Sequence, residues 1–307
     1  MGDSAAIVLA DVTRRFGRAV AVDGVSLSVA RGTIQAIVGP DGAGKTTLIR
    51  LICGAMPPDA GGILVDGLDA VRETARVQGA VGYMPQRFSL YPDLTVAENL
   101  RFYGDIFGVE RASFAVRSAQ LLDDFALAEF SARRADELSG GMKQKLALAC
   151  ALIHSPSTIL LDEPTAGVDP VSRRAFWRIL YRINQSGTTI LLSTPYMDEA
   201  ERADAVSFMS HGSILSIGTP DQLKSSLSGE VIEIRCARRT DARRALHGEP
   251  QLQSIEIFGD ALHALAASHD AAVSAIERRL SAAGITDARL RRIPPSLEDA
   301  FVARLVS

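Results

Sequence analysis

The N-terminal part of the chain alternates between apolar and polar residues in short runs. Residues 7–29 alternate around two pairs of turn residues, Phe16-Gly17 and Asp23-Gly24, which predicts antiparallel strands. A compact apolar strand is expected at 33–38, followed by a glycine-rich loop and a helix that begins near Lys45. The chain therefore begins with a β-rich region that leads into a strand–loop–helix unit.

The middle of the chain changes from strands to helices and back. A strand pair is expected around 63–65 and 80–84, and apolar residues then recur at helical spacing over about 94–152, which predicts an inserted helical subdomain. Further on, apolar strands alternate with helices, and this alternation predicts a parallel α/β core. The expected elements there are strands at 158–161, 188–193 and 205–209 and a helix at 173–185.

The last part of the chain follows a polar linker at 218–229 and has the pattern of a small α+β domain. Strands and helices alternate there in the order βαββαβ, which is that of a ferredoxin-like unit. After Pro294 and Pro295 have broken the chain, Ser296 and Asp299 are expected to cap a last short helix. We therefore divide the chain into domains 1–229 and 230–307. The expected C-terminal elements are strands at 231–236, 252–258, 262–266 and 286–293 and helices at 241–246 and 271–282.

Composition limits the class of protein. The 307 residues suffice for a main domain of about 200 residues with an appendage. Hydrophobic residues make up 47% and charged residues 22%, which is typical of a globular protein and argues against a disordered chain. The formal net charge of -3 lacks the basic excess of proteins that bind phosphate backbones, so no nucleic-acid partner is expected.

Cysteine use and hydropathy indicate the compartment. Cys53, Cys150 and Cys236 lie far apart without CxxC spacing, which argues against a disulfide framework or a zinc site. No apolar run approaches the roughly 18 residues of a membrane-spanning helix, and residues 1–15 lack the pattern of a signal peptide. We therefore expect a soluble, cytoplasmic protein that reaches the membrane only through a partner.

One motif predicts a nucleotide site. Residues 39–46 match G-x-x-x-x-G-K-[ST] between a predicted strand and a predicted helix, where backbone N–H groups and the helix N-terminus can hold phosphates. Lys45 is expected to reach the β and γ phosphates, and the Thr46 hydroxyl to bind Mg²⁺. The alternative is an incidental glycine turn. The residues of the motif are Gly39, Pro40, Asp41, Gly42, Ala43, Gly44, Lys45 and Thr46.

A second motif adds two carboxylates. The apolar strand at 158–161 ends in Asp162 and Glu163, followed by Pro164. Carboxylates at the end of a buried strand lie at a sheet edge, where Asp162 can hold Mg²⁺ and Glu163 can polarise the water that attacks the γ phosphate. Alone, such an acidic strand end is as often an ordinary turn, but with the phosphate loop it indicates a P-loop ATPase.

A third motif points to a family. Leu138-Ser139-Gly140-Gly141-Met142-Lys143-Gln144 resembles the signature motif of ABC ATPases, although a lone Ser-Gly-Gly is more often a capped helix start. The resemblance implies a P-loop NTPase (RecA-like) α/β core with an antiparallel β subdomain and a helical subdomain. It also implies that two chains pair head to tail with ATP between them, because Ser139, Gly140 and Gly141 offer a second set of phosphate-binding N–H groups.

Other positions match the family in order over about residues 7–225. The resemblance implies that Phe16 stacks on adenine, that Gln86 touches Mg²⁺ and the attacking water, and that Asp169 lies in a loop between the two nucleotide sites. The resemblance also implies that Thr47 joins the phosphate loop in nucleotide binding. Taken singly, each could be an ordinary core, surface or turn residue.

One position departs from the family pattern. Pro195 stands in Ser193-Thr194-Pro195-Tyr196-Met197-Asp198-Glu199-Ala200, where the family usually has a histidine that contacts the γ phosphate, and proline has no side-chain donor. His154 and His211 are expected on the surface and do not replace it. The resemblance thus implies either slow hydrolysis or a mixed dimer whose second ATP-binding subunit supplies the histidine.

The narrower resemblance is to ATP-binding subunits of ABC-2 type exporters, including multidrug and antibiotic-resistance pumps. It rests on the phosphate loop, on 82–86, on 90–100 and on the C-terminal 295–301. It implies a separate ABC-2 permease, a homodimer or heterodimer at the inner face of the membrane, and drugs or hydrophobic compounds as cargo.

Several alternatives stay open on sequence alone. The chain could be an exporter of lipid or polysaccharide, or a non-transport ABC ATPase, although it has one cassette and no heptad repeats. A P-loop GTPase or kinase is disfavoured because no N-K-x-D stretch for guanine occurs and because neither class explains the Ser139 motif. The segment 230–307 serves either packing and dimer support or ligand-dependent regulation.

Overall fold

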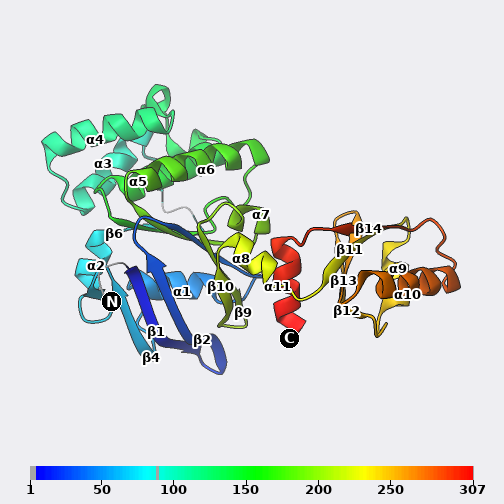
Figure 1. Cartoon of the computed structure of the whole chain (residues 1–307). Coiled ribbons are helices and arrows are strands. Elements are labelled where there is room, and N and C mark those ends of the chain that lie inside the picture. Colours follow the sequence, from blue (N-terminus) through cyan, green and yellow to red (C-terminus); the bar gives the residue numbers. More distant parts are fainter. Residues whose placement is uncertain (1–4, 88–89, 307) are drawn as a thin grey trace. The chain divides into compact units, whose positions relative to one another are not determined.

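The computed structural model describes residues 5–87 and 90–306, so residues 1–4 of the start 1–15 lie outside the described residues. The chain forms two compact units, which we call unit 1 (Met1–Ile217) and unit 2 (Gly218–Ser307). Their elements are labelled in Figure 1. The α/β class with an antiparallel sheet and a helical region, predicted from the sequence, is confirmed in unit 1.

A six-stranded sheet forms the core of unit 1, in the order β10-β9-β3-β8-β7-β6. The register shows parallel pairing of β3 with β8 and β9, and of β7 with β6 and β8. Every residue of β3, β7 and β8 is buried, so helices and the second sheet cover these central strands. The strands are β3 (Ile34–Val38), β6 (Val81–Met84), β7 (Thr158–Asp162), β8 (Thr189–Thr194), β9 (Ala205–Ser210) and β10 (Ser213–Gly218).

A second, antiparallel sheet of unit 1 has the order β2-β1-β4-β5. The turn predicted at Asp23-Gly24 is wrong, because both residues lie inside β2. There Gly24, at φ +59°, accompanies a shift in the register with β1. The predicted pairing of 63–65 with 80–84 is wrong, because β4 pairs with β1 and β6 with β7, and local periodicity cannot specify a partner strand. The strands are β1 (Ala5–Phe16), β2 (Ala19–Ala30), β4 (Ala60–Val65) and β5 (Leu68–Asp69).

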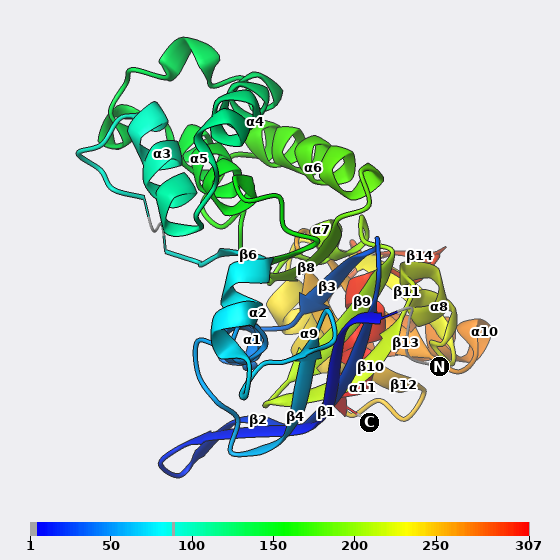
Figure 2. The same cartoon turned by 90° about the vertical axis from the view of Figure 1, so that its left-hand side faces the viewer.

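The predicted helical region contains three helices, α3 (Val96–Ile106), α4 (Arg111–Asp124) and α5 (Gly140–Leu152), and two short 3₁₀ turns (Ala128–Phe130 and Ala135–Glu137). Figures 1 and 2 show these helices gathered at one end of unit 1, away from β1, β2 and β4. A capping box starts α3, since the Thr95 hydroxyl accepts from the Glu98 amide and the Glu98 side chain accepts in return.

Three of the remaining helices of unit 1, α1, α6 and α7, follow strands of the central sheet, whereas α2 follows β5 of the antiparallel sheet. The helix α6 begins three residues before its prediction, because Asp169 caps it and Pro170 occupies its first turn. Helix α1 is buried on several sides, with Leu48, Ile49, Leu51 and Ile52 fully buried in the core shared by both sheets. This packing fixes the residues that precede its first turn. The helices are α1 (Lys45–Ile52), α2 (Thr74–Ala80), α6 (Pro170–Gln185) and α7 (Met197–Ala200).

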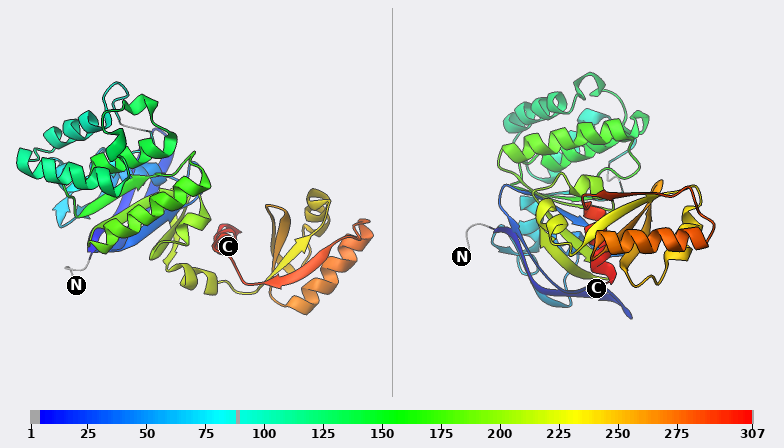
Figure 3. Two further views of the ribbon diagram at one scale, coloured as in Figure 1. Left: turned by 90° about the horizontal axis from the view of Figure 1, so that it is seen from above. Right: turned by 45° about the vertical axis from the view of Figure 1, so that its right-hand side comes forward.

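Unit 2 contains the predicted ferredoxin-like unit. Its sheet has the order β12-β13-β11-β14 with antiparallel neighbours. Figures 1 and 3 show α9 and α10 on one face of this sheet, where Ala242, Leu246 and Ile276 belong to one apolar core. The elements are β11 (Glu230–Arg235), α9 (Arg239–Leu246), β12 (Leu252–Phe258), β13 (Ala261–Ala266), α10 (His269–Ala282) and β14 (Arg289–Ile293).

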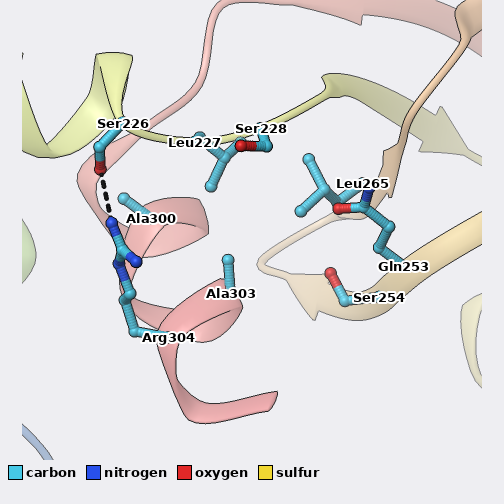
Figure 4. A pocket seen from close by; sticks show the side chains of 9 residues that line it. All are labelled: Ser226, Leu227, Ser228, Gln253, Ser254, Leu265, Ala300, Ala303 and Arg304. Atoms are coloured by element: carbon cyan, nitrogen blue, oxygen red, sulfur yellow. Dashed lines mark hydrogen bonds between the residues drawn. The ribbon is translucent and has the colours of Figure 1, made fainter. Parts of the chain in front are cut away.

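Two further helices of unit 2 flank the ferredoxin-like unit. The predicted linker contains α8 (Pro220–Ser225), which packs against α11 (Leu297–Val306). Figure 4 shows the Arg304 guanidinium donating to the Ser226 hydroxyl at 3.0 Å, beside a cavity of about 280 Å³. This contact explains why unit 2 begins at Gly218, inside the segment that the sequence assigned to the first domain.

The predicted cap of the last helix is confirmed. Asp299 accepts hydrogen bonds from the Ser296 amide and hydroxyl, at 2.8 and 2.6 Å, and the Asp299 amide donates back to Ser296 Oγ. His263 of β13 lies 2.8 Å from the other carboxylate oxygen. Burial acts to raise the pKa of Asp299, but the bonds from His263 and Ser296 outweigh it and lower the pKa below its ordinary value.

Candidate nucleotide-binding site

The loop between β3 and α1, residues 39–46, is held from two sides. A Cβ atom on Gly39 would lie 2.0 Å from the Met209 carbonyl oxygen, and one on Gly44 would lie 2.2 Å from the Ala21 carbonyl oxygen. Gly44 also has φ +104°, a conformation that side chains disfavour. Glycine is therefore required at both positions, and the loop is fixed between β9 and β2.

The loop leads into the N-terminus of α1 without a capping side chain. Gly44 is the N-cap residue and makes no side-chain hydrogen bond to the first turn. The first amide groups of a helix have no partner within the helix, and their dipoles favour a negative group. The start of α1 therefore suits an anion such as phosphate.

Lys45 supplies the positive charge at the base of this loop. Its Nζ donates to the carbonyl oxygens of Gly39 and Pro40, at 2.8 and 3.1 Å, and lies 3.3 Å from Glu163 Oε1. The lysine side chain is only 4% exposed. A buried ammonium group held mainly by carbonyl dipoles can accept a further anion at short range.

Asp162 lies fully buried at the end of β7 and accepts hydrogen bonds from two hydroxyl groups. Thr46 Oγ1 and Ser193 Oγ donate to Asp162 Oδ1, at 3.0 and 2.7 Å, whereas the buried Oδ2 has no hydrogen-bond partner among the described residues. A buried carboxylate oxygen without a partner is costly. The unpaired oxygen and the Thr46 hydroxyl beside it are the hard oxygen ligands that Mg²⁺ prefers, so this pair of residues fits a magnesium ion.

Glu163 follows directly and is held in an unusual conformation. Its φ of +48° is left-handed, and its amide donates to Ser193 Oγ at 2.9 Å. The side chain accepts from Gln86 Nε2 at 2.8 Å and faces Lys45. Left-handed non-glycine residues persist where surrounding contacts fix them, often at active sites. The strand end thus directs Asp162 and Glu163 to different parts of one site.

These residues line one cavity of about 330 Å³. It brings together most of the phosphate loop with Gln86 of the segment after β6 and Glu163 of the segment after β7. Its volume is within the lower range of ligand pockets. The lining residues are Ala21, Asp41, Gly42, Ala43, Gly44, Lys45, Thr46, Thr47, Gln86 and Glu163.

Other predicted site residues lie outside this cavity lining. Phe16 is 47% exposed at the end of β1, with the Arg14 guanidinium 5.1 Å from its ring centre. Asp169 caps α6 by accepting from the amides of Val171 and Ser172, both at 3.0 Å. Hydrogen bonds from Ser172 lower the pKa of Asp169, so the carboxylate is ionised at neutral pH.

The predicted signature residues start α5. The Ser139 hydroxyl accepts from the Met142 amide at 3.3 Å, and Ser139 and Gly140 are exposed. A Cβ atom on Gly141 would lie 3.0 Å from Ser172 Oγ of α6. Gln144, one turn further on, donates to the Ala166 carbonyl oxygen at 3.3 Å. The exposed start of α5 is thus tied to the segment that leads from Glu163 into α6.

Two positions differ from the sequence prediction. Ser193, which sequence reasoning missed as a site residue, joins Asp162 and Glu163, and its role follows only from the register that pairs it with Asp162. His154 is half-buried and not on the surface: its ring stacks on Phe107 at 3.8 Å, and burial lowers its pKa. The predicted exposure of His211 is confirmed.

Unit 1 has a second, apolar cavity, and one of its lining residues directly precedes Gln86 in the sequence. It has a volume of about 450 Å³ and includes Pro85, one residue before Gln86, and Ile106, which is 60% exposed. Burial raises the pKa of Tyr83 in its wall to about 12, so this phenol stays neutral. The lining residues are Cys53, Ala55, Gln78, Val81, Tyr83, Pro85, Tyr103, Ile106, Phe107 and Ala151.

Within residues 5–87 and 90–306, no helix is both long and apolar enough to cross a lipid bilayer. The longest helix of unit 1 is α6, with 16 residues, and it carries several arginines.

The apolar cavity that includes Pro85 has the exposed Ile106 in its lining. An apolar surface of this kind is typical of a protein interface.

Comparison with known proteins gives one family match within unit 1 and relatives matched over nearly the whole chain. The family described as "ABC transporter" matches residues 22–166, a range that includes the phosphate loop, Ser139 and Glu163. The chain is 36% identical over 307 residues to the daunorubicin resistance ATP-binding protein DrrA3 of Streptomyces coeruleorubidus, covering 98% of this chain and 96% of that protein.

Two further matches cover part of the chain. The chain is 39% identical over 220 residues to the probable multidrug ABC transporter ATP-binding protein YbhF of Escherichia coli (strain K12), and the match covers 72% of this chain but only 38% of that protein. The dimeric structure of MJ0796, a bacterial ABC transporter cassette, superposes with a TM-score of 0.63 at 26% identity, covering 69% of this chain and 98% of that one.

Proposed function

The chain belongs to the ATP-binding proteins of the ABC transporter family, and from this premise we propose that it hydrolyses ATP to drive an exporter of the ABC-2 type. The observation that carries the proposal is the single cavity that joins the phosphate loop, Lys45 and Glu163. Two relatives, matched over 98% and 72% of this chain, have names that describe drug resistance and multidrug transport, and these names support export.

In this proposal the phosphate loop binds the triphosphate of ATP. Its amide groups, the start of α1 and Lys45 hold the β and γ phosphates. Thr46 and Asp162, with Gln86, would hold Mg²⁺, which neutralises charge on the phosphates when bound. Glu163 orients and polarises the attacking water and accepts its proton. The cofactors are therefore ATP and Mg²⁺.

The same proposal assigns the exposed start of α5 to a second chain's nucleotide. Ser139 and Gly140 are exposed and do not line the cavity of their own chain among the described residues. A dimer in which each chain offers this helix start to its partner's γ phosphate uses both half-sites. The likeness to a dimeric cassette supports such a pair. Pro195 favours a heterodimer whose partner subunit carries a histidine, with the homodimer as the alternative.

We propose that the apolar cavity near Gln86 receives a helix of the separate ABC-2 permease. Its exposed Ile106 and apolar walls suit one face of an amphipathic helix. Movement of Gln86 with the bound nucleotide would then reach the permease. On this proposal the chain lies on the cytoplasmic face of the membrane, and its cargo is a drug or another hydrophobic compound.

The division into an ATP-binding domain (1–229) and an accessory domain (230–307) is likewise proposed. Unit 2 has its own core, so we assign it a packing or dimer-supporting role. Removal of 218–307, measured both for the isolated subunit and with the permease, tests this role. Loss of activity only in the assembled transporter supports it, whereas a change in the isolated subunit indicates direct regulation of the ATPase.

The central test compares the wild type with Lys45→Ala and Lys224→Ala. Lys224 is the control lysine: it belongs to α8 of unit 2, outside the cavity lining and the start of α5, and its Nζ lies 3.1 Å from Asp221 Oδ1. We expect Lys45→Ala to abolish MgATP binding and turnover, because the buried ammonium group is lost. Measurable turnover by Lys45→Ala close to that of the wild type would refute the proposed site.

A further inference from the structure

A buried carboxylate outside the cavity joins two loops of the site. Glu199 belongs to α7, just after β8, and its side chain is only 2% exposed. Burial of a charge is costly unless partners compensate it. The partners of Glu199 therefore indicate what the charge does.

Glu199 accepts from two buried threonine hydroxyls on different segments. Thr165 Oγ1 donates to Glu199 Oε1, and Thr194 Oγ1 donates to Oε2 at 2.7 Å. Thr165 lies two residues after Glu163, whereas Thr194 directly precedes Pro195. One carboxylate thus connects the segment that carries Glu163 to the segment that replaces the family's histidine.

Arg173 balances the charge of Glu199 and extends the connection to α6. Its Nε donates to Glu199 Oε1 at 3.0 Å, and its Nη2 donates to both oxygens of Asp198 at 3.1 Å. The guanidinium also lies 4.4 Å from the ring centre of Tyr196. Arg173 lies in the first turn of α6, where its amide donates to the Asp169 carbonyl oxygen at 2.9 Å, so its side chain joins this turn to Glu199.

The segment between Glu163 and Asp169 has two anchors outside the cluster: Ser193 Oγ accepts from the Glu163 amide at 2.9 Å, and Gln144 Nε2 donates to the Ala166 carbonyl oxygen at 3.3 Å. Its own backbone bonds are local turns, from the Ala166 amide to Glu163 and from the Val168 amide to Thr165. Local turns fix the shape of a segment but not its position relative to the sheet. Glu199 adds a further anchor from the β8 side.

We propose that Glu199 is a positioning residue for ATP hydrolysis, which holds Thr165 and Thr194 together so that Glu163 and Asp169 keep their places beside the nucleotide. This inference rests on the proposed ATPase function. It assigns to the Thr165–Glu199–Thr194 cluster an effect on turnover rather than on nucleotide binding, since the phosphate loop makes no contact with the cluster among the described hydrogen bonds.

The experiment uses threonine substitutions that keep shape and remove one hydroxyl. Thr165→Val and Thr194→Val break the cluster, and Thr165→Ser restores its hydroxyl. Thr158→Val is the matched control: Thr158 is fully buried at the opposite end of β7 and donates to Asp66 Oδ2 at 2.9 Å. Each variant is assayed as full-length protein for kcat, KM for ATP, affinity for a non-hydrolysable ATP analogue and Tm.

We expect Thr165→Val and Thr194→Val to lower kcat about tenfold with KM and analogue affinity within about twofold of wild type, because a small misplacement of catalytic groups affects the transition state more than binding. Thr165→Ser should recover most of the loss. Thr158→Val should lower Tm by a similar amount but keep kcat within about twofold of the wild-type value.

Two outcomes overturn the inference while leaving the ATPase assignment intact. One is an unchanged kcat in both cluster variants of an active wild type. The other is a fall in kcat that Thr158→Val reproduces at equal loss of Tm, since the cluster would then act through stability alone. A wild type that binds ATP but does not hydrolyse it, even with permease, refutes the proposed function itself, a result distinct from these.

Discussion

Replacement of Ser193 by alanine isolates the contact that organises the two carboxylates. The serine is fully buried, and its hydroxyl donates to Asp162 Oδ1 at 2.7 Å while accepting from the Glu163 amide. Loss of a hydrogen bond to an ionised group costs about 1.5–3 kcal/mol. The Glu163 amide keeps a second acceptor, the Ser193 carbonyl oxygen at 3.2 Å, so it adds little to this cost.

The expected loss of stability is therefore about 2 kcal/mol, or roughly 4–8 °C in Tm for a domain of this size. The substitution should also weaken Mg²⁺ binding. Residues that orient a metal ligand typically change metal affinity by about 10–100-fold when removed. The Mg²⁺ concentration for half-maximal turnover should rise by about that factor in Ser193→Ala, because the Asp162 carboxylate loses its shortest hydrogen bond.

The assay titrates Mg²⁺ at fixed ATP and follows unfolding by the fluorescence of Trp177, the one tryptophan of the chain, which is buried in α6. Ser207→Ala is the control, since Ser207 is equally buried in the same sheet but accepts from Gln35. A Ser193→Ala protein that loses stability as Ser207→Ala does, yet keeps the Mg²⁺ dependence of the wild type, would refute the assignment of Asp162.

Three further predictions concern single side chains. Glu163→Gln should lower turnover by roughly 10²–10⁴-fold and leave nucleotide binding in place, since the base is lost but Lys45 remains; turnover and fluorescent-nucleotide binding measure this. Pro195→His should raise turnover by roughly two- to tenfold, because a donor is added without the full preorganisation of an evolved site. Burial lowers the pKa of His154 below 6.5, so unit 1 should lose stability as the pH falls from about 6.5 through that lowered pKa, as urea unfolding at pH 5–7 would show.

Each of these predictions has an opposing outcome. Nucleotide affinity that falls together with turnover in Glu163→Gln would mean that the residue binds substrate. Unchanged turnover of Pro195→His, alone and with permease, would remove the explanation offered for the missing histidine. His154→Phe keeps an aromatic partner for Phe107 and should flatten the pH dependence, so a slope equal to that of the wild type would assign it to other groups.

The sequence predicted the phosphate loop and the acidic strand end because their chemistry is local. Gly39 to Thr46 must be continuous to form a cradle, and Asp162-Glu163 must follow a buried strand, so spacing alone identified both. The ferredoxin-like order of unit 2 was equally accessible, since each element carries its own period of apolar residues.

Contacts between distant segments were not accessible from the sequence. Ser193 joins the site only because β7 and β8 pair in a register that places it beside Asp162. The wrong pairing of 63–65 with 80–84 has the same origin, since the sequence of a short strand does not determine which strand pairs with it. His154 was placed on the surface from its turn-like neighbours, whereas Phe107, far away in sequence, covers it.

The link between α5 and α6 has a consequence for how two nucleotides act together. Gly141 abuts Ser172, and Gln144 holds the backbone at Ala166. In a head-to-tail pair, a pull on Ser139 by one ATP would therefore pass as a mechanical strain to the carboxylate that serves the other ATP. The two hydrolysis events would not be independent, and a sigmoidal dependence of rate on ATP would arise from the fold itself.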